Sequence, residues 1–209
     1  MNINQKFESL IKELEKNDSV KIENLSFGNT PTNETLKEII FEDTNIKLFN
    51  FISNIYDQIS SLRLKWKCNL IEKTYVKKYD SEDEEIFGEI NILSLGKMLN
   101  SNKNIKSEYW IGNFEKKELE SFENFRYFEN GDEFIKIGFF IEEKQLSNEM
   151  YFITAGETGF SKAPFNFKEF FELMLKCKGY LGWQYNILFP NTDNAIEMEY
   201  YLNEIFESK

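Results

Sequence analysis

The chain contains no histidine, and this absence excludes several kinds of active site. Neither a Ser-His-Asp nor a Cys-His nucleophile pair can form, no histidine can act as a general base, and no zinc site can use an imidazole ligand. Two cysteines are also too few for a four-thiolate metal site. Any enzyme with this composition would need aspartate, glutamate, lysine, tyrosine or cysteine as its base.

The two cysteines, Cys68 and Cys177, lie far apart in strongly apolar stretches. Buried thiols are favoured over a disulfide or a nucleophile, because cysteine without a partner behaves as a small hydrophobic residue. No basic start followed by an apolar segment is visible after Met1, and no apolar run approaches the roughly 20 residues that span a bilayer. We therefore expect a reduced, cytoplasmic protein with no membrane partner.

Basic residues are outnumbered: 25 Lys and Arg stand against 36 Asp and Glu, for a formal net charge of −11. Arginine occurs only at Arg63 and Arg126. Because nucleic-acid binding needs clustered Lys and Arg that displace counterions, we expect no nucleic-acid partner. The one short basic stripe (Arg63, Lys65 and Lys67) falls on alternate positions of an expected strand, which is typical of a solvated sheet face.

The chain of 209 residues is rich in hydrophobic side chains: 41% are hydrophobic and 16% are aromatic. A chain of this length buries roughly 70% of its surface on folding, enough for one domain without disulfides or metals. Spacings of three and four residues predict helices, and alternation or continuous apolar runs predict strands. The expected helices are 3–14, 36–40, 48–59, 167–175 and 198–206. The expected strands are 62–70, 86–93, 125–128, 134–141 and 150–154.

This order, helices then strands then helices, predicts an α+β fold: a mainly antiparallel sheet of about five or six strands, with helices at the N- and C-terminal ends packed around it. Residues 134–141 form a nearly continuous apolar run, which indicates a central strand, and Asn130-Gly131-Asp132 before it indicates a hairpin turn. Residues 17–32 and 100–106 are expected to be loops. Gly156 and Gly159 fit neither a P-loop nor a dinucleotide-binding turn and predict a strand-to-helix turn.

The acidic run at 80–85 is the most distinctive polar feature. It lacks the glycine of a calcium loop, so it is either a solvated loop or a surface for a basic partner. Four aromatic residues outside the periodic segments either cap the core or anchor an interface: Tyr109, Trp110, Trp183 and Tyr185. The 36 acidic residues also leave a carboxylate-based hydrolase open, although no pair is marked by its spacing.

Two segments carry a family resemblance: Leu62-Arg-Leu-Lys-Trp66 and Phe87-Gly-Glu-Ile-Asn-Ile-Leu-Ser94. Together with 134–141, 150–153 and the Phe-rich segment 165–175, they make the chain resemble the SUKH superfamily of Smi/Knr-like proteins over roughly residues 35–180. Trp66 and Gly88 are matching positions and are expected to be structural. The resemblance implies a single SUKH-like domain over 1–209, with 1–32 at its periphery.

The resemblance further implies a non-enzymatic binding protein, since bacterial members of the superfamily are widely inferred to be immunity proteins that neutralise polymorphic toxins. An acidic inhibitor suits a basic nuclease toxin, because opposite charge steers association. We expect a protein partner, a basic toxin domain, and no catalytic residue, cofactor or metal. The residues expected to bind the partner are Asp80, Glu82, Asp83, Glu84, Glu85, Tyr109 and Trp110. A regulatory or scaffold protein, as eukaryotic members suggest, and the hydrolase remain alternatives.

Overall fold

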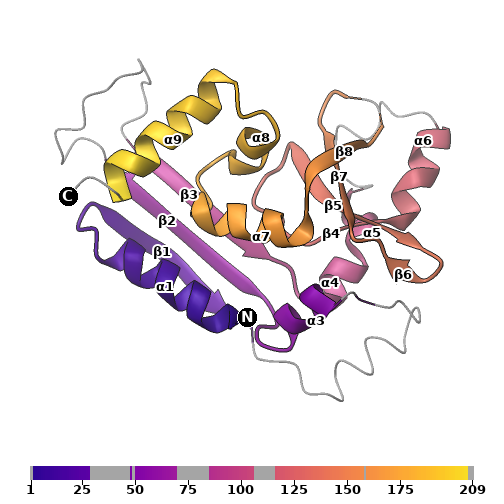
Figure 1. The fold of residues 1–209 in the computed structure, drawn as a ribbon, viewed down its shortest axis with the longest axis horizontal. Helices are drawn as coiled ribbons and strands as arrows, with labels where there is room; N and C mark the ends of the chain where they lie inside the picture. The colour runs from indigo at the N-terminus through magenta and orange to yellow at the C-terminus, as the bar shows by residue number, and fades with distance from the viewer. Residues whose placement is uncertain are drawn as a thin grey trace. The chain divides into compact units, whose positions relative to one another are not determined.

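The structure of the protein is a computed structural model that describes residues 2–28, 48, 50–69, 85–105, 116–157 and 159–206. The chain divides into two compact units (Figure 1). Unit 1 comprises Met1–Ser26, Arg63–Ile90 and Phe171–Lys209, and unit 2 comprises Phe27–Leu62 and Asn91–Phe170. The expectation of a single domain stays a prediction.

Unit 1 holds most of a three-stranded sheet and the terminal helices. The sheet has the order β1-β2-β3, from β1 (Val20–Phe27), β2 (Leu62–Asn69) and β3 (Glu85–Ile92). The helices are α1 (Ile3–Glu15), most of α7 (Phe167–Lys176), α8 (Trp183–Leu188) and α9 (Asp193–Phe206).

The helices of unit 1 form where the sequence supplies both a cap and an apolar stripe. Asn2 caps α1, since its Oδ1 accepts the backbone N–H of Gln5 at 3.0 Å. The stripe of α1 buries Phe7, whose ring meets that of Phe171 edge to face with 5.8 Å between centroids. Lys6 and Glu172 add an ion pair of 2.8 Å between the same two helices.

The sheet of unit 1 is buried on one face, as the alternation in β2 predicts. Leu64, Trp66 and Cys68 are fully buried. Trp66 lies directly over Gly88 of β3, where an added Cβ would fall 2.2 Å from the indole ring. The Trp66 Nε1–H donates to the backbone oxygen of Lys178 at 2.7 Å. Trp66 and Gly88 are therefore structural partners across two strands.

A short segment after α7 pairs with β3. The Glu89 N–H donates to the oxygen of Gly179 at 2.6 Å, and the Leu181 N–H donates to the oxygen of Phe87 at 2.9 Å. Gly179 has a φ of 71°, and a Cβ there would lie 2.6 Å from the Glu89 oxygen. Glycine is thus required both for the backbone conformation and for the close approach.

Unit 2 contains a five-stranded sheet and short helices. Its strands have the order β4-β5-β7-β8, with β6 paired to β5: β4 (Phe125–Tyr127), β5 (Ile135–Glu142), β6 (Gln145–Leu146), β7 (Glu149–Thr154) and β8 (Ser161–Asn166). Its helices are α3 (Asn50–Tyr56), α4 (Leu95–Leu99), α5 (Ser101–Ile105), α6 (Lys116–Ser121) and the 3₁₀ helix η2 (Phe122–Asn124).

The central position of β5 and the turn before it are confirmed. β5 pairs antiparallel with both β4 and β7, and Ile135 through Phe139 are buried. In the preceding turn, Asp132 Oδ1 accepts the backbone N–H of Phe134 at 2.7 Å and of Ile135 at 3.2 Å. Burial raises the pKa of this carboxyl, and the two backbone hydrogen bonds oppose the shift.

The expected α+β class is confirmed: within the described ranges, antiparallel strands form two sheets and helices lie towards both ends of the chain. Several local expectations were wrong. Part of the expected loop 17–32 is the strand β1, and part of 100–106 is the helix α5. Gly156 and Gly159 join β7 to the strand β8 and not to a helix. The expected helix 36–40 lies outside the described residues.

The sequence pattern does not predict β1 and β8 because both are edge strands. β1 and β8 each end a sheet, so their side chains are largely exposed and their alternation is weak. β8 also contains Pro164, which is tolerated in edge strands.

No helix in the described part of the chain has the length and apolar character needed to cross a membrane.

Candidate functional site

Of the residues expected to bind a partner, only Glu85 is among those that the structure describes. Six others lie outside the described ranges: Asp80, Glu82, Asp83, Glu84, Tyr109 and Trp110. Glu85 begins β3, and its Oε1 lies 2.7 Å from the Nζ of Lys67 on β2. The hydrogen bond to Glu85 raises the pKa of the Lys67 ammonium.

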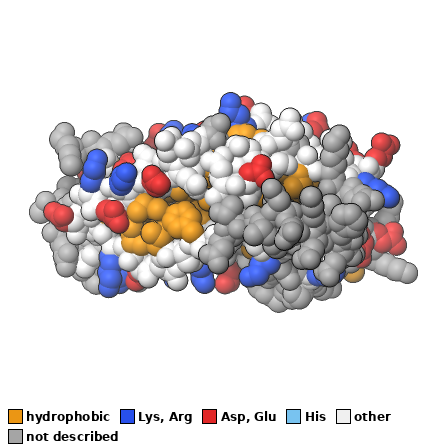
Figure 2. All heavy atoms as spheres, turned by 90° about the horizontal axis from the view of Figure 1, so that it is seen from below, with side chains coloured by type: hydrophobic (Ala, Val, Ile, Leu, Met, Phe, Trp, Pro, Cys, Tyr) orange, Lys and Arg blue, Asp and Glu red, His pale blue; other side chains and the backbone are white. Residues whose placement is uncertain are grey.

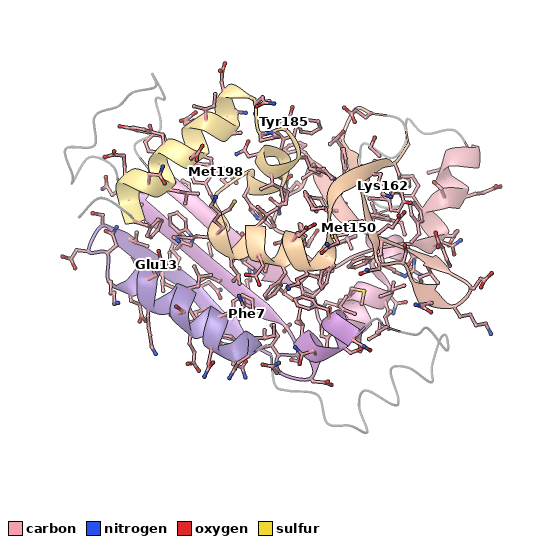
Figure 3. The ribbon with its side chains drawn as sticks, viewed as in Figure 1. Phe7, Glu13, Met150, Lys162, Tyr185 and Met198 are labelled. Atoms are coloured by element: carbon pink, nitrogen blue, oxygen red, sulfur yellow. The ribbon has the colours of Figure 1, made fainter. Side chains whose placement is uncertain are left out.

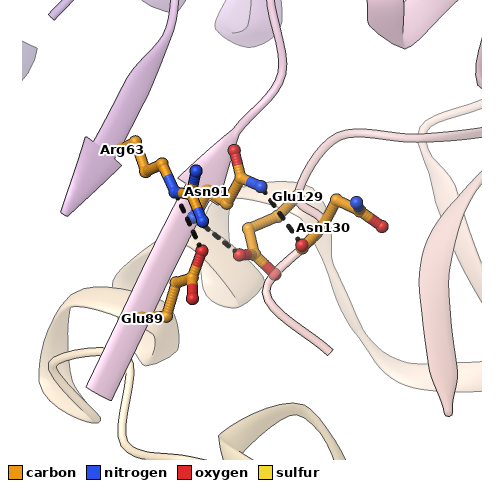
Figure 4. A network of polar contacts seen from close by, with 5 residues as sticks. All are labelled: Arg63, Glu89, Asn91, Glu129 and Asn130. Carbon is orange, nitrogen blue, oxygen red and sulfur yellow. Dashed lines mark hydrogen bonds and ion pairs between the residues drawn. The ribbon is translucent and has the colours of Figure 1, made fainter. Parts of the chain in front are cut away.

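The basic stripe of β2 is matched by acids on its neighbours. Lys67 Nζ lies 3.9 Å from Glu23 Oε1 as well as close to Glu85, and Arg63 Nε lies 3.2 Å from Glu89 Oε1 (Figure 4). This face of the sheet is therefore a mixed-charge surface and not an isolated row of cations.

A buried acid in unit 2 has a structural role. Figure 4 also draws Glu129, whose Oε1 accepts the backbone N–H of Asn91 at 2.9 Å, while Asn91 Nδ2 donates to the oxygen of Asn130 at 3.3 Å. Glu129 is buried, and it forms an isolated bridge with Ile92. These bonds fix the loop that leads towards β5.

The candidate site is a groove in unit 1 between the start of β3, the turn at 180–182, α8 and α9, with a volume of about 560 Å³. We call it the β3–α9 groove. Its lining residues are Glu85, Ile86, Phe87, Tyr180, Leu181, Gly182, Tyr185, Asn186, Asn194, Glu197 and Tyr201. This set, drawn from the described residues, contains two carboxylates, two carboxamides and four aromatic rings, and it contains neither lysine nor arginine.

The shape of the groove follows from local backbone signals. Gly182 precedes α8 with a φ of 74°, which permits the sharp turn after the segment paired with β3. Thr192 caps α9, since its Oγ1 accepts the N–H of Ala195 at 3.3 Å. On α9, Asn194, Glu197 and Tyr201 are spaced by three and four residues and so share one helix face.

Two apolar side chains at the groove are open to solvent: Leu181 is 65% exposed and Tyr185 is 40% exposed. Figure 3 shows Tyr185 on α8 and Met198 on the adjoining α9, and Asn186 Nδ2 donates to the Met198 sulfur at 3.6 Å. An exposed tyrosine beside a concave polar surface is typical of an interface anchor, and Leu181 adds exposed apolar surface next to it.

Tyr201 differs from the other tyrosines of the groove in being 1% exposed. Its hydroxyl has no hydrogen-bond partner among the described residues. Buried hydroxyls are nearly always hydrogen-bonded, because an unpaired one costs about 1–3 kcal/mol. Tyr201 is therefore a groove-lining residue whose hydroxyl is buried and has no partner among the described residues.

The sequence indicates only part of this site. Glu85 and Tyr185 stand out in it, whereas sequence reasoning missed the turn at 180–182 and the polar face of α9. The spacing of Asn194, Glu197 and Tyr201 is a signal that could have indicated that face. Tyr201 also belongs to the apolar stripe of the helix, and this second pattern hides the first.

Two other concave regions in the described part of the chain have lysine in their walls, unlike the β3–α9 groove. A cavity of about 590 Å³ beside β7 and β8 is lined by Glu149 and Lys162, which form an ion pair of 2.6 Å (Lys162 and Met150 are labelled in Figure 3). That hydrogen bond lowers the pKa of Glu149. A cavity of about 520 Å³ between α7, α8 and α9 is lined in part by Lys178, which pairs with Glu13 at 2.9 Å.

The cysteines do not form a reactive centre in the described structure. Cys68 and Cys177 are buried thiols, as expected, and burial raises the pKa of Cys177 to about 11. Among the described residues, no group of three or more His, Cys, Asp or Glu side chains could hold a metal ion.

The molecular surface mixes hydrophobic and charged groups. Figure 2 shows a cluster of hydrophobic side chains on the face seen from below, with acidic and basic side chains around it.

Comparison with protein-family models, with curated proteins and with solved structures finds no match for this chain. The resemblance to the SUKH superfamily, and the function that it implies, stay predictions.

Proposed function

We propose that the chain is a non-enzymatic, cytoplasmic immunity protein that binds and occludes a basic toxin domain, with nucleases as the suggested toxin class. The observation that carries the proposal is the β3–α9 groove, where carboxylates and aromatic rings meet and no lysine or arginine of the described ranges lines the wall. Together with the net charge of −11, this groove favours a cationic protein surface over nucleic acid or an anionic ligand.

The SUKH resemblance supports the same proposal, since bacterial members of that superfamily are widely inferred to be immunity proteins. Toxin binding would use the exposed Leu181 and Tyr185 as apolar anchors, while Glu85 and Glu197 would supply charge. Opposite charge would speed association, and added salt would slow it.

The test is protection in cells. The chain is co-expressed with each toxin gene encoded beside it, and survival is scored against an empty vector. We expect one neighbouring toxin to be neutralised, and neutralisation should weaken in Leu181→Ala. Glu204→Gln, a charge change on α9 at a residue that does not line the groove, is the matched control and should protect fully. Failure to protect against every neighbouring toxin would overturn the proposal.

The hydrolase alternative also has an observation behind it, because Glu85 and Glu197 line one groove. It requires one carboxyl to act as acid and the other as base or nucleophile. Hydrolysis of a panel of chromogenic glycosides by the purified chain, lost in Glu197→Gln and retained in Glu204→Gln, would establish the enzyme and refute the binding role.

A further inference from the structure

We infer that the β3–α9 groove is a recognition pocket for a single arginine side chain presented by the protein partner. This inference rests on the proposed function for the nature of the partner, and it adds the chemical group that the partner inserts. The groove lies wholly within unit 1, and its volume of about 560 Å³ is in the range of sites that enclose a small ligand or side chain.

The charge of the groove selects a cation. Glu85 and Glu197 line it, and no basic side chain of the described residues does. Lys67 pairs with Glu85, and it approaches from β2 without being part of the wall. The wall of the groove thus contains two carboxylates and no cation, and Glu85 is ion-paired with a lysine at the margin.

Tyr201 provides a second and independent indication of a ligand. Its hydroxyl is buried without a hydrogen-bond partner among the described residues, although the ring lines the groove. The phenol oxygen can accept a hydrogen bond. A donor that enters the groove would satisfy this oxygen and remove the cost of leaving it unpaired.

The number and type of acceptors favour guanidinium over ammonium. Acceptors come from three elements: Glu85 on β3, Asn186 on α8, and Glu197 with Tyr201 on α9. Guanidinium offers five N–H donors in a rigid plane, whereas ammonium offers three on a strongly hydrated point charge. Guanidinium also stacks on aromatic faces, and Phe87, Tyr180 and Tyr185 are aromatic residues of the same wall.

The experiment titrates the full ¹⁵N-labelled chain with acetyl-Gly-Arg-Gly-amide and follows backbone and side-chain amide signals by NMR. The neutral isostere acetyl-Gly-citrulline-Gly-amide and the lysine peptide are titrated in parallel. We expect saturable shifts centred on Asn186, Asn194 and the turn at 180–182 with the arginine peptide, and no saturation with citrulline. Equal responses to arginine and citrulline, or shifts centred elsewhere, would overturn the inference. Equal affinity for the lysine peptide would overturn the choice of arginine.

Two conservative variants test the residues. Glu197→Gln removes the charge and Tyr201→Phe removes only the hydroxyl. Each substitution should raise the Kd for the arginine peptide by about tenfold. Glu204→Gln should bind as the wild type does. Thermal melting and spectral dispersion verify the fold of each variant. Undiminished affinity in folded Glu197→Gln and Tyr201→Phe would refute the pocket.

The outcomes separate this inference from the proposed function. Arginine binding in a protein that protects against no neighbouring toxin would leave the pocket standing and overturn the immunity role. Protection that persists undiminished in both Glu197→Gln and Tyr201→Phe would leave the immunity role standing and overturn the pocket as the place where the partner is recognised.

Discussion

Gly88→Ala should destabilise the protein because Trp66 occupies the space that a side chain at position 88 would need. An added Cβ would lie 2.2 Å from Cε2 and Nε1 and 2.5 Å from Cζ2 of the indole. Favourable contacts between carbon atoms begin near ~3.5 Å, so the ring would have to move by roughly 1 Å. Trp66 is fully buried and packs edge to face on Phe206, with 5.8 Å between ring centroids, so a retreat of the indole would disturb its packed neighbours.

The expected cost has two parts. Overpacking a well-filled core costs about 1–3 kcal/mol. A shift of the indole would also disturb the 2.7 Å hydrogen bond from Nε1 to the Lys178 oxygen, a net loss of about 1 kcal/mol. The free energy of unfolding should therefore fall by about 2–4 kcal/mol. In an unobstructed strand the same substitution would stabilise the protein by roughly 0.4–1 kcal/mol, through the unfolded chain.

Urea denaturation followed by circular dichroism measures this change, and a double-mutant cycle tests its cause. Trp66→Leu removes the obstructing ring atoms, so Gly88→Ala should cost little in that background, with a coupling of about 1.5 kcal/mol or more. Gly156→Ala is the control: its φ of 88° makes alanine strained, yet nothing lies within 4 Å. The loss of unfolding free energy caused by Gly156→Ala should be the same with and without Trp66→Leu. A loss below about 1 kcal/mol for Gly88→Ala, or an undiminished loss in the Trp66→Leu background, would refute the reasoning.

Three further predictions concern single groups. Tyr56→Phe removes a buried hydroxyl that donates to the Leu93 oxygen at 2.9 Å, so the free energy of unfolding should fall by about 1–2 kcal/mol; an unchanged denaturation midpoint would contradict this. Burial raises the pKa of Asp132, so the folded chain binds the Asp132 proton more tightly than the unfolded chain does. The stabilisation that this protonated carboxyl contributes is lost as pH rises through the folded pKa. Asp132→Asn keeps the acceptor oxygen and cannot ionise, so unfolding measured from about pH 4 to 7 should show a flatter loss of stability with pH, and an identical slope would count against the assignment. With its pKa raised to about 11, Cys177 should react with a disulfide reagent at about pH 8 far more slowly in native than in urea-unfolded protein, and equal rates would contradict its burial.

The role of a side chain can be predicted from the sequence where that role depends on the local periodicity of the chain. Trp66 and Cys68 alternate with solvated residues because β2 has one buried face, and that alternation is visible in the sequence. The continuous apolar run of β5 likewise indicates a strand covered on both faces. β1 could not be recognised in this way, because Leu25 and Phe27 are exposed at a sheet edge, where propensity and burial no longer agree.

The candidate site was harder to predict because its parts meet only after folding. Glu85 follows the acidic run, Tyr185 belongs to a helix of six residues, and Glu197 lies on a helix whose apolar stripe dominates its pattern. No local spacing relates these three positions. Pairing of the 179–181 segment with β3 brings them together, and that pairing depends on Gly179 and its close approach to Glu89.

The same contacts connect the stability of unit 1 to the groove. Trp66 donates to the oxygen of Lys178, and the next residue, Gly179, accepts the N–H of Glu89. Leu181 then donates to Phe87, so the turn that lines the groove is attached to the sheet at each of these three bonds. A change at Gly88 that displaces Trp66 should therefore loosen this turn before it unfolds the sheet. In such a variant the arginine peptide should bind more weakly even under conditions where the chain remains folded, because the acceptors on β3 and α9 would no longer be held at a fixed separation.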